Sequence, residues 1–252
     1  MFSTVTQKVK ETKQPRGGYV NPKNFEVVCR KDDYVLSEKE NIHPALVGLA
    51  VDYLTRYMMG AAVDEAFEIS LMGASTAGKI RQAQNIIKKI NGLDDESIFN
   101  ACKMVGYDVC YRAGMEYFKP VNEIRADQPT IENIRIMVKR AFSFWEEYGP
   151  LVLQGLAFEK AYTFEIIAGD ADYLTEDTLW DFKVSKKKPN KDHTLQLLIY
   201  YIMGCHSIHE KEFKKVKKIG IFNPRLNIVY YMNISKIDKD IIKEISENII
   251  GY

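Results

Sequence analysis

The sequence predicts an α/β (α+β) protein with a mixed central β-sheet, flanking helices and an inserted helical lobe. An amphipathic helix is expected over 44–59, and the helical pattern then continues almost unbroken over 61–149. From residue 161 the pattern changes to short strands, followed by a helix over 192–204 and by further strands. This order of elements is typical of a sheet domain that carries a helical insertion.

The composition is that of an ordinary folded protein. The chain has 252 residues, of which 46% are apolar and 27% charged, and this length suits one large domain or a domain with an insertion. The formal net charge is +1, so an anion-binding site has to come from local clustering of charge. Apolar runs long enough for a membrane span, about 18 residues, are not seen.

The chain start and the cysteines indicate a cytoplasmic protein. Residues 1–18 are polar and rich in lysine, without the apolar core of a secretory signal. The four cysteines are scattered without paired metal-ligand spacing, which favours a reduced compartment. We expect no membrane partner.

Two regions are expected from the pattern: an N-terminal extension over 1–42 and a single domain over 43–252 with its helical insertion at about 61–149. Residues 1–25 are expected to be loosely held, with short strands at 25–29 and 33–37. Pro44 suits the first helical position and Gly60 suits the helix end. A late hairpin over 217–234 and a final Ile-rich helix after Asp238 complete the expected elements.

Three polar residues stand out on the central strands, where packed side chains are normally apolar. They are Asp172, Asp181 and Lys183. Because strand side chains alternate between faces, Asp181 and Lys183 share one face, and a hairpin between 171–174 and 178–185 brings Asp172 beside them.

Two carboxylates and a lysine suit hydrolysis of a phosphodiester. Mg²⁺ prefers oxygen ligands and usually takes one or two carboxylates together with water and substrate phosphate. A nearby lysine orients or deprotonates the attacking water, and it offsets charge on the phosphate. The competing interpretation is an exposed strand with a surface acid–lysine pair, which is common for an Asp-x-Lys pattern alone.

Further residues favour the metal site. Gly169 precedes Asp172 by three residues, and Gln196 and Tyr200 are spaced i, i+4 on the helix over 192–204, with His193 one turn earlier. The three blocks Gly169-Asp-Ala-Asp172, Asp181-Phe-Lys183 and Gln196-Leu-Leu-Ile-Tyr200 together resemble the RecB-like branch of the PD-(D/E)XK nuclease superfamily. The close match covers about 45 residues.

The resemblance implies a restriction-endonuclease-like core and a role for each matching residue. It implies that Asp172 and Asp181 ligate Mg²⁺ or Mn²⁺ together with the main-chain carbonyl of Phe182. Lys183 is then expected to act on the nucleophilic water, and Gln196 and Tyr200 to contact the substrate.

Relatives of this branch also carry a histidine on an upstream helix. At the matching place this chain has Asp52, four residues after Gly48, and His43 at the helix start is an alternative. The competing interpretation of Asp52 is a surface acid paired with Arg56 at i+4. An iron–sulfur cluster, present in some relatives, is not expected, because only Cys205 follows the central stretch.

Basic stretches next to the central strands favour DNA as the partner. Lys186, Lys187, Lys188 and Lys191 form a basic loop, 211–218 adds a second cluster, and Arg225 follows in a turn. Phosphate contacts dominate nucleic-acid binding, although charge runs are often only solvated loops.

A segment in the helical region nearly matches a phosphate-binding loop. It runs from Gly73 to Gly78-Lys79-Ile80, but Ile80 stands where Mg²⁺ needs a hydroxyl, and the flanking segments have helical patterns. A turn between two helices is therefore expected, with the helix after Lys79 facing DNA or a partner.

The sequence thus favours a metal-dependent deoxyribonuclease, an exonuclease similar to phage-type and recombination enzymes, acting in DNA processing, repair or recombination. The alternatives are a non-catalytic nucleic-acid-binding module on a nuclease fold and, third, a P-loop nucleotide-binding protein.

Overall fold

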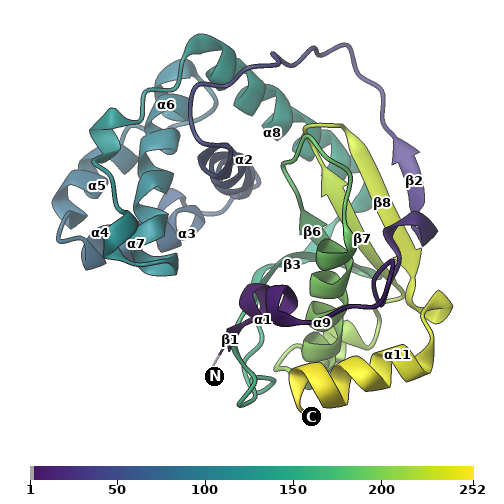
Figure 1. Ribbon diagram of the computed structural model, residues 1–252. Coiled ribbons are helices and arrows are strands. Elements are labelled where there is room, and N and C mark those ends of the chain that lie inside the picture. Colours follow the sequence, from purple (N-terminus) through teal and green to yellow (C-terminus); the bar gives the residue numbers. More distant parts are fainter. Residues whose placement is uncertain (1–2) are drawn as a thin grey trace. The chain divides into compact units, whose positions relative to one another are not determined.

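A computed structural model describes residues 3–252 of the chain (Figure 1). The chain divides into two compact units. The sheet unit comprises Met1–Lys31 and Trp145–Tyr252, and the helical unit comprises Asp32–Phe144. Each unit is described by itself.

The sheet unit is built on a six-stranded mixed sheet with the strand order β2-β8-β7-β6-β5-β3. Neighbouring strands are antiparallel except for β6 and β7, which are parallel. The mixed sheet flanked by helices confirms the predicted fold class at this level. The strands are β2 Glu26–Cys29, β3 Leu151–Ala157, β5 Asp170–Thr175, β6 Thr178–Phe182, β7 Lys218–Asn223 and β8 Ile228–Asn233.

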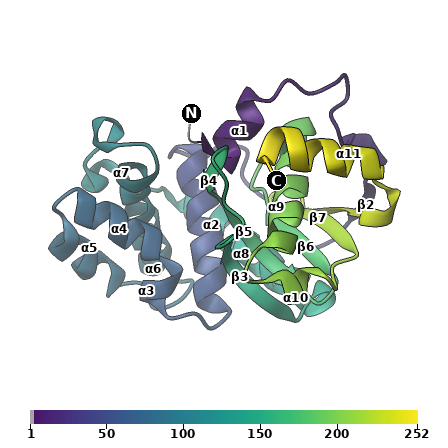
Figure 2. The ribbon, with the colours of Figure 1, turned by 90° about the horizontal axis from the view of Figure 1, so that it is seen from below.

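Helix α9, Lys191–His206, connects the two parallel strands, because a parallel pair needs a crossover. Its first turn is closed by a capping box, in which the Asn190 side chain accepts from the main-chain nitrogens of Asp192 and His193. The helix lies against β5, β6 and β7 (Figure 2). Its leucines and isoleucines join the main core with Leu174, Leu179 and Ile221 of those strands.

The opposite face of the sheet is an aromatic layer. Trp145, near the end of helix α8 (Gln128–Tyr148), packs against Tyr173 and Phe182 with ring centroids 4.8 and 5.9 Å away. Tyr148 meets Trp180 edge to face at 5.4 Å. As expected from strand alternation, Trp180 and Phe182 therefore share this face, away from Asp181.

The N-terminal segment belongs to the core of the sheet unit, so the expectation of a loose extension was wrong for the described residues. Strand β1, Ser3–Thr4, pairs in parallel with β4, Ile166–Ala168. Helix α1, Val5–Glu11, begins in a capping box between Thr4 and Gln7, and its Val5 and Val9 are buried in the main core. This burial holds the segment in place, whereas its lysine-rich composition indicated disorder.

The late elements agree with their predictions. Strands β7 and β8 form the expected antiparallel hairpin, and Asp238 caps helix α11, Lys239–Glu244. A π-helical turn, Ile245–Ile250, continues that helix and buries three isoleucines. The short helix α10, Glu210–Phe213, precedes β7.

Within residues 3–252, every helix is too short or too polar to cross a bilayer.

The helical unit contains the helices that the long helical pattern of the sequence predicted. Short 3₁₀ turns connect several of the elements. The helices are α2 Pro44–Met58, α3 Val63–Ala66, α4 Glu68–Thr76, α5 Ile80–Ile87, α6 Asp95–Met104, α7 Asp108–Arg112 and most of α8.

The predicted boundaries differ from the observed units. Helix α2 was placed with the sheet domain, but it packs against α6 and belongs to the helical unit. Residues 33–37 form no strand, because the main chain of this segment bonds to side chains of α8. The Ser37 nitrogen donates to Asn133, and the Tyr34 carbonyl accepts from Arg140. Strand β3 was not predicted.

The segment that resembles a phosphate-binding loop begins inside helix α4 and ends at the start of helix α5. Gly73 is buried inside α4, where a Cβ atom would come within 2.1 Å of the Tyr107 carbonyl oxygen. Gly78 has a φ of +65°, a left-handed conformation that suits glycine at a helix end, and Lys79 immediately precedes α5. A phosphate-binding loop follows a strand, whereas a helix precedes this one.

A buried carboxylate ties three helices of the helical unit together. Asp108 on α7 is 2% exposed and accepts hydrogen bonds from the Tyr53 hydroxyl of α2 and the Ser70 hydroxyl of α4. The Arg112 guanidinium lies 3.5 Å from the same carboxylate. Burial raises the pKa of Asp108 above its usual value, although these hydrogen bonds and Arg112 oppose the rise.

This raised pKa predicts a loss of stability as the pH increases. The folded protein holds the Asp108 proton more tightly than the unfolded chain, so this contribution is full below about pH 4 and falls as the pH rises through the folded pKa. The Asp108→Asn variant stays neutral and lacks this loss. Urea unfolding of both proteins over a pH series measures the difference, and a constant difference across the series would contradict the prediction.

Candidate metal centre

Asp172 and Asp181 face each other on neighbouring antiparallel strands. In the β5–β6 pair Tyr173 is opposite Trp180 and Leu174 is opposite Leu179, and continuing this register by one residue places Asp172 opposite Asp181. Both acids therefore lie on the same face as Leu174 and Leu179, which is the face that α9 covers. The structure thus brings together the two acids predicted to bind metal.

The Asp172 carboxylate is held by the main chain of β6. Its Oδ2 accepts a hydrogen bond of 2.7 Å from the Phe182 nitrogen. In a strand the nitrogen and carbonyl of one residue point to the same side, so the Phe182 carbonyl also faces β5. The three predicted oxygen donors, from Asp172, Asp181 and Phe182, are therefore adjacent.

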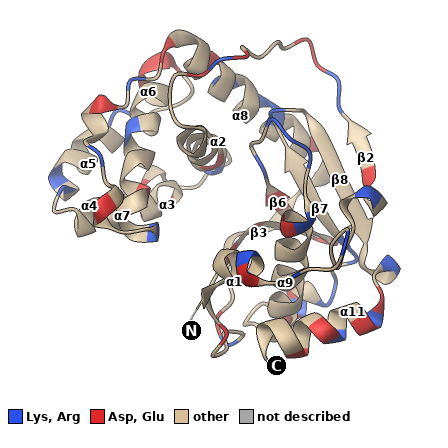
Figure 3. Ribbon diagram, in the orientation of Figure 1, with Lys and Arg blue, Asp and Glu red and all other residues tan. Residues whose placement is uncertain are grey.

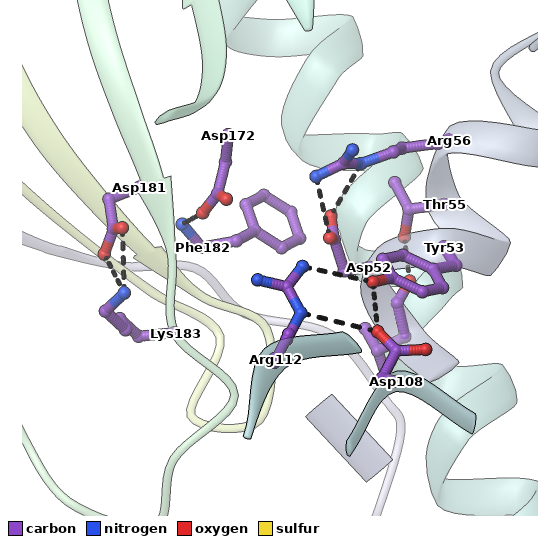
Figure 4. A network of polar contacts seen from close by, with 11 residues as sticks. Asp52, Tyr53, Thr55, Arg56, Asp108, Arg112, Asp172, Asp181, Phe182 and Lys183 are labelled. Carbon is purple, nitrogen blue, oxygen red and sulfur yellow. Dashed lines mark hydrogen bonds and ion pairs between the residues drawn. The ribbon is translucent and has the colours of Figure 1, made fainter. Parts of the chain in front are cut away.

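Asp181 and Lys183 form an ion pair, as their alternation on β6 predicted (Figure 4). The lysine Nζ donates to Asp181 Oδ1 at 2.8 Å and lies 2.7 Å from Oδ2. The Asp181 side chain is 3% exposed and that of Lys183 is 24% exposed. Despite its burial, Asp181 Oδ2 accepts no hydrogen bond with good geometry, so the lysine charge alone compensates it.

Gln196 and Tyr200 of α9 lie beside the two acids. The Gln196 amide donates to the Tyr200 hydroxyl at 2.8 Å, as expected for i, i+4 neighbours. Burial raises the pKa of Tyr200 well above its usual value, and the charges of Asp181 and Asp172 raise it further. Tyr200 therefore remains a neutral hydroxyl, which accepts the hydrogen bond from Gln196.

His193 also lies close to the charged groups of Lys183 and Asp181. It occupies the first turn of α9, where its Nδ1 accepts from the Asn190 nitrogen at 3.2 Å. Burial lowers its pKa, as does the charge of Lys183, while Asp181 opposes the change. The imidazole is therefore held neutral. The sequence signal for it is the spacing i, i+3 to Gln196 on one helix face.

The N-terminal segment adds contacts that sequence reasoning missed. Val5 of α1 packs on Gly169, where a Cβ atom would lie 2.5 Å from Val5 Cγ2 and 3.5 Å from Tyr200 Cε1. The Thr6 hydroxyl lies 3.5 Å from the Gln196 amide nitrogen. The available signal is the Thr4–Gln7 capping box, which marks a helix start but not the partner of that helix.

The donor set fits a hard divalent cation. Asp172, Asp181 and the Phe182 carbonyl supply oxygen ligands only, which Mg²⁺ and Mn²⁺ accept. Groups of three or more His, Cys, Asp or Glu that could hold a metal do not occur within residues 3–252. Mg²⁺ sites in proteins often use one or two carboxylates and fill the remaining positions with water and phosphate. Asp181 Oδ2, buried with an ion-pair contact to Lys183 but with no hydrogen bond of good geometry, is the clearest candidate ligand atom.

Asp52 and His43 belong to the helical unit. Asp52 forms two hydrogen bonds with Arg56, of 3.2 and 2.9 Å, so the i, i+4 pair expected as its alternative interpretation is present (Figure 4). His43 caps α2, where its Nδ1 accepts from the Ala45 nitrogen at 3.2 Å. A role of either residue in metal binding stays a prediction.

The basic residues expected to bind DNA, which are blue in Figure 3 with all other Lys and Arg, differ in exposure. Lys186, Lys187 and Lys188 are exposed in the loop after β6, and Lys191 is exposed at the start of α9. Arg225 is only 9% exposed, so it is not part of a basic surface, contrary to expectation. The loop lysines, by contrast, are accessible to a polyanion.

Comparison of the chain with protein-family models, with curated proteins and with solved structures finds no match.

The contact between Gly169 and Val5 predicts a specific cost of adding one methyl group. A Gly169→Ala change places Cβ against the stiff side chain of Val5 and should destabilise the protein by about 1–3 kcal/mol. Gly92→Ala is the matched control, because the nearest atom to its Cβ is 3.9 Å away. Urea unfolding compares the two variants, and equal stability would show that α1 does not pack at this place.

Proposed function

We propose that the chain is a Mg²⁺- or Mn²⁺-dependent deoxyribonuclease that hydrolyses phosphodiester bonds in DNA. The observation that carries this proposal is the pair of facing acids on β5 and β6, with Lys183 bound to one of them. Burying Asp181, with the half-buried Asp172 beside it, against one lysine costs folding free energy, because charges lose their hydration. A function that needs the acids accounts for this cost.

The surrounding elements support a restriction-endonuclease-like core. Two antiparallel strands carry the acids, and the helix that follows them carries Gln196 and Tyr200 on the covered face. This is the order of strand, strand and helix that the resemblance to the RecB-like PD-(D/E)XK nucleases implies. The helix then leads to the parallel strand β7, which fixes α9 against the acids.

In the proposed reaction, different residues of the centre bind the metal ion, orient the attacking water and contact the substrate. Asp172, Asp181 and the Phe182 carbonyl hold the metal ion, which when bound polarises the phosphate and acidifies water. Lys183, whose ammonium already lies beside Asp181, orients the attacking water and offsets charge on the phosphate. Gln196 and Tyr200 supply neutral hydrogen-bond donors for the substrate.

DNA is the proposed substrate because exposed lysines follow the site directly in sequence. Lys186, Lys187, Lys188 and Lys191 suit contacts to a phosphate backbone. The resemblance to phage-type and recombination enzymes favours an exonuclease in DNA processing, repair or recombination. The second candidate, a non-catalytic nucleic-acid-binding module, has no use for two acids that repel phosphate.

Replacing Lys183 should abolish hydrolysis and leave the fold intact. Loss of the ammonium removes the group that orients water, so the rate should fall by about 10²–10⁴-fold. The assay follows end-labelled linear DNA and closed circular DNA with Mg²⁺, Mn²⁺ or EDTA. An exonuclease degrades the linear DNA and leaves the circle intact.

Two variants separate chemistry from folding. Lys183→Gln retains a donor for the buried Asp181 carboxylate, whereas Lys183→Ala removes it. Lys218→Ala is the matched control, because Lys218 also pairs with an aspartate, Asp177, but on β7. Full activity in Lys183→Gln would rule out the proposed role of the lysine.

Metal binding should depend on Asp181. Titration of Mn²⁺ by calorimetry without DNA should show a site that Asp181→Asn weakens by at least about tenfold, because a charged carboxylate ligand becomes a neutral amide. Asp177→Asn, which changes an acid in the turn before β6, should bind as the wild type does. DNA binding without any metal binding would favour the non-catalytic module.

A further inference from the structure

The helical unit contains a groove that is separate in sequence from the metal centre. It has a volume of about 490 Å³, within the range of ligand sites, roughly 300–1,000 Å³. Residues of α5 and α6 and of the 3₁₀ turn Val121–Glu123 line it. All of these residues belong to the helical unit.

The lining of the groove is basic. Arg81, Lys89 and Lys103 contribute three cations, and the lining includes no Asp or Glu. The chain as a whole has 35 basic and 34 acidic residues, so this local excess is not a consequence of composition. Glu96 lies 3.5 Å from Lys89, but both side chains are more than half exposed, and such a pair is weak.

Side-chain amides make up most of the remaining lining. Asn100 is 6% exposed, and its amide nitrogen is fixed by a 2.8 Å hydrogen bond to the Glu96 carbonyl. Gln82, Asn85 and Asn122 add three more amides. Amides donate hydrogen bonds to phosphate oxygens and also form hydrogen bonds with base edges. Amides and cations together can therefore bind both the phosphate and the base of a nucleotide in a strand.

The polar side chains that line the groove come mainly from helices that pack into the helical unit. Helix α5 buries Ala83 and Ile87 in the helical unit, while Ile86, which is also buried, lines the groove. On α6 the Lys103 ammonium lies 4.4 Å from the centroid of the Phe99 ring, a cation–π contact that restricts the lysine. The groove is therefore formed mainly by two packed helices.

We propose that this groove binds a single-stranded segment of DNA through its phosphates and base edges. The identity of the ligand rests on the proposed function, because the metal centre supplies DNA as the substrate. The cations of the groove neutralise phosphates, and the amides contact the exposed bases. The helical unit thus has its own contribution to substrate affinity, independent of hydrolysis.

The test measures binding in EDTA, so that it does not depend on cleavage. Fluorescence anisotropy follows a labelled single-stranded oligonucleotide of 20 residues over a series of salt concentrations. The groove variant is Arg81→Gln with Lys103→Gln. The control variant, Lys39→Gln with Lys88→Gln, removes the same charge from exposed residues of the same unit that do not line the groove.

The groove variant should bind the strand about tenfold more weakly, and the control variant less than twofold. Loss of two phosphate contacts should also reduce the slope of log Kd against log salt by about 1.4. Circular dichroism checks that both variants are folded. Equal affinity of the two variants would overturn the proposal, as would absence of strand binding by the wild type.

Competition experiments test the chemical class of the ligand. Unlabelled oligonucleotide should displace the labelled strand, while dAMP or polyglutamate at the same charge concentration should displace it at least tenfold less well. Equal displacement by either competitor would overturn a strand-binding groove. Nuclease activity is measured separately on the wild type, so failure of the proposed function is distinguishable from failure of this inference.

Discussion

The ion pair between Asp181 and Lys183 is the interaction on which the rest of the sheet unit depends. A carboxylate that is nearly inaccessible needs an opposite charge, and Lys183 provides it from the same strand face. Asp172 is compensated by the Phe182 nitrogen. Both partners come from the end of β6 and the residue that follows it, so a slip of one residue in the β5–β6 register would turn one of the two acids into the aromatic layer.

Much of this arrangement could be predicted from local sequence. Alternation on β6 separates Asp181 and Lys183 from Trp180, and helical spacing joins Gln196 to Tyr200. Strand β3 escaped prediction because it is an edge strand with mostly exposed or half-exposed residues, and Gly155 with a φ of +60° interrupts its pattern. Periodicity is a weak signal where neither face is fully buried.

The remaining differences arise from contacts between residues far apart in the chain. The capping box at Thr4 predicts a helix start, but the core that buries Val5 is formed by residues more than 150 positions later. The boundary between the two units at Lys31 is likewise determined by contacts in the fold, and the composition of the sequence does not mark it. Residue types were enough to predict the candidate metal centre. The packing of α1 beside this centre could be seen only in the folded structure.

The pairing of β2 with β8 joins residues about 200 positions apart and has a consequence for biosynthesis. The helical unit is one continuous stretch, so all of its residues have left the ribosome before the partner of β2 is translated. Strand β2 and helix α1 must wait, unpaired, while a folded unit forms behind them. Closing so long a loop costs only slightly more entropy than closing a shorter one, because the cost grows with the logarithm of length. The nascent chain therefore exposes the two apolar valines of α1 until the residues of β4 and α9 that cover them have been translated.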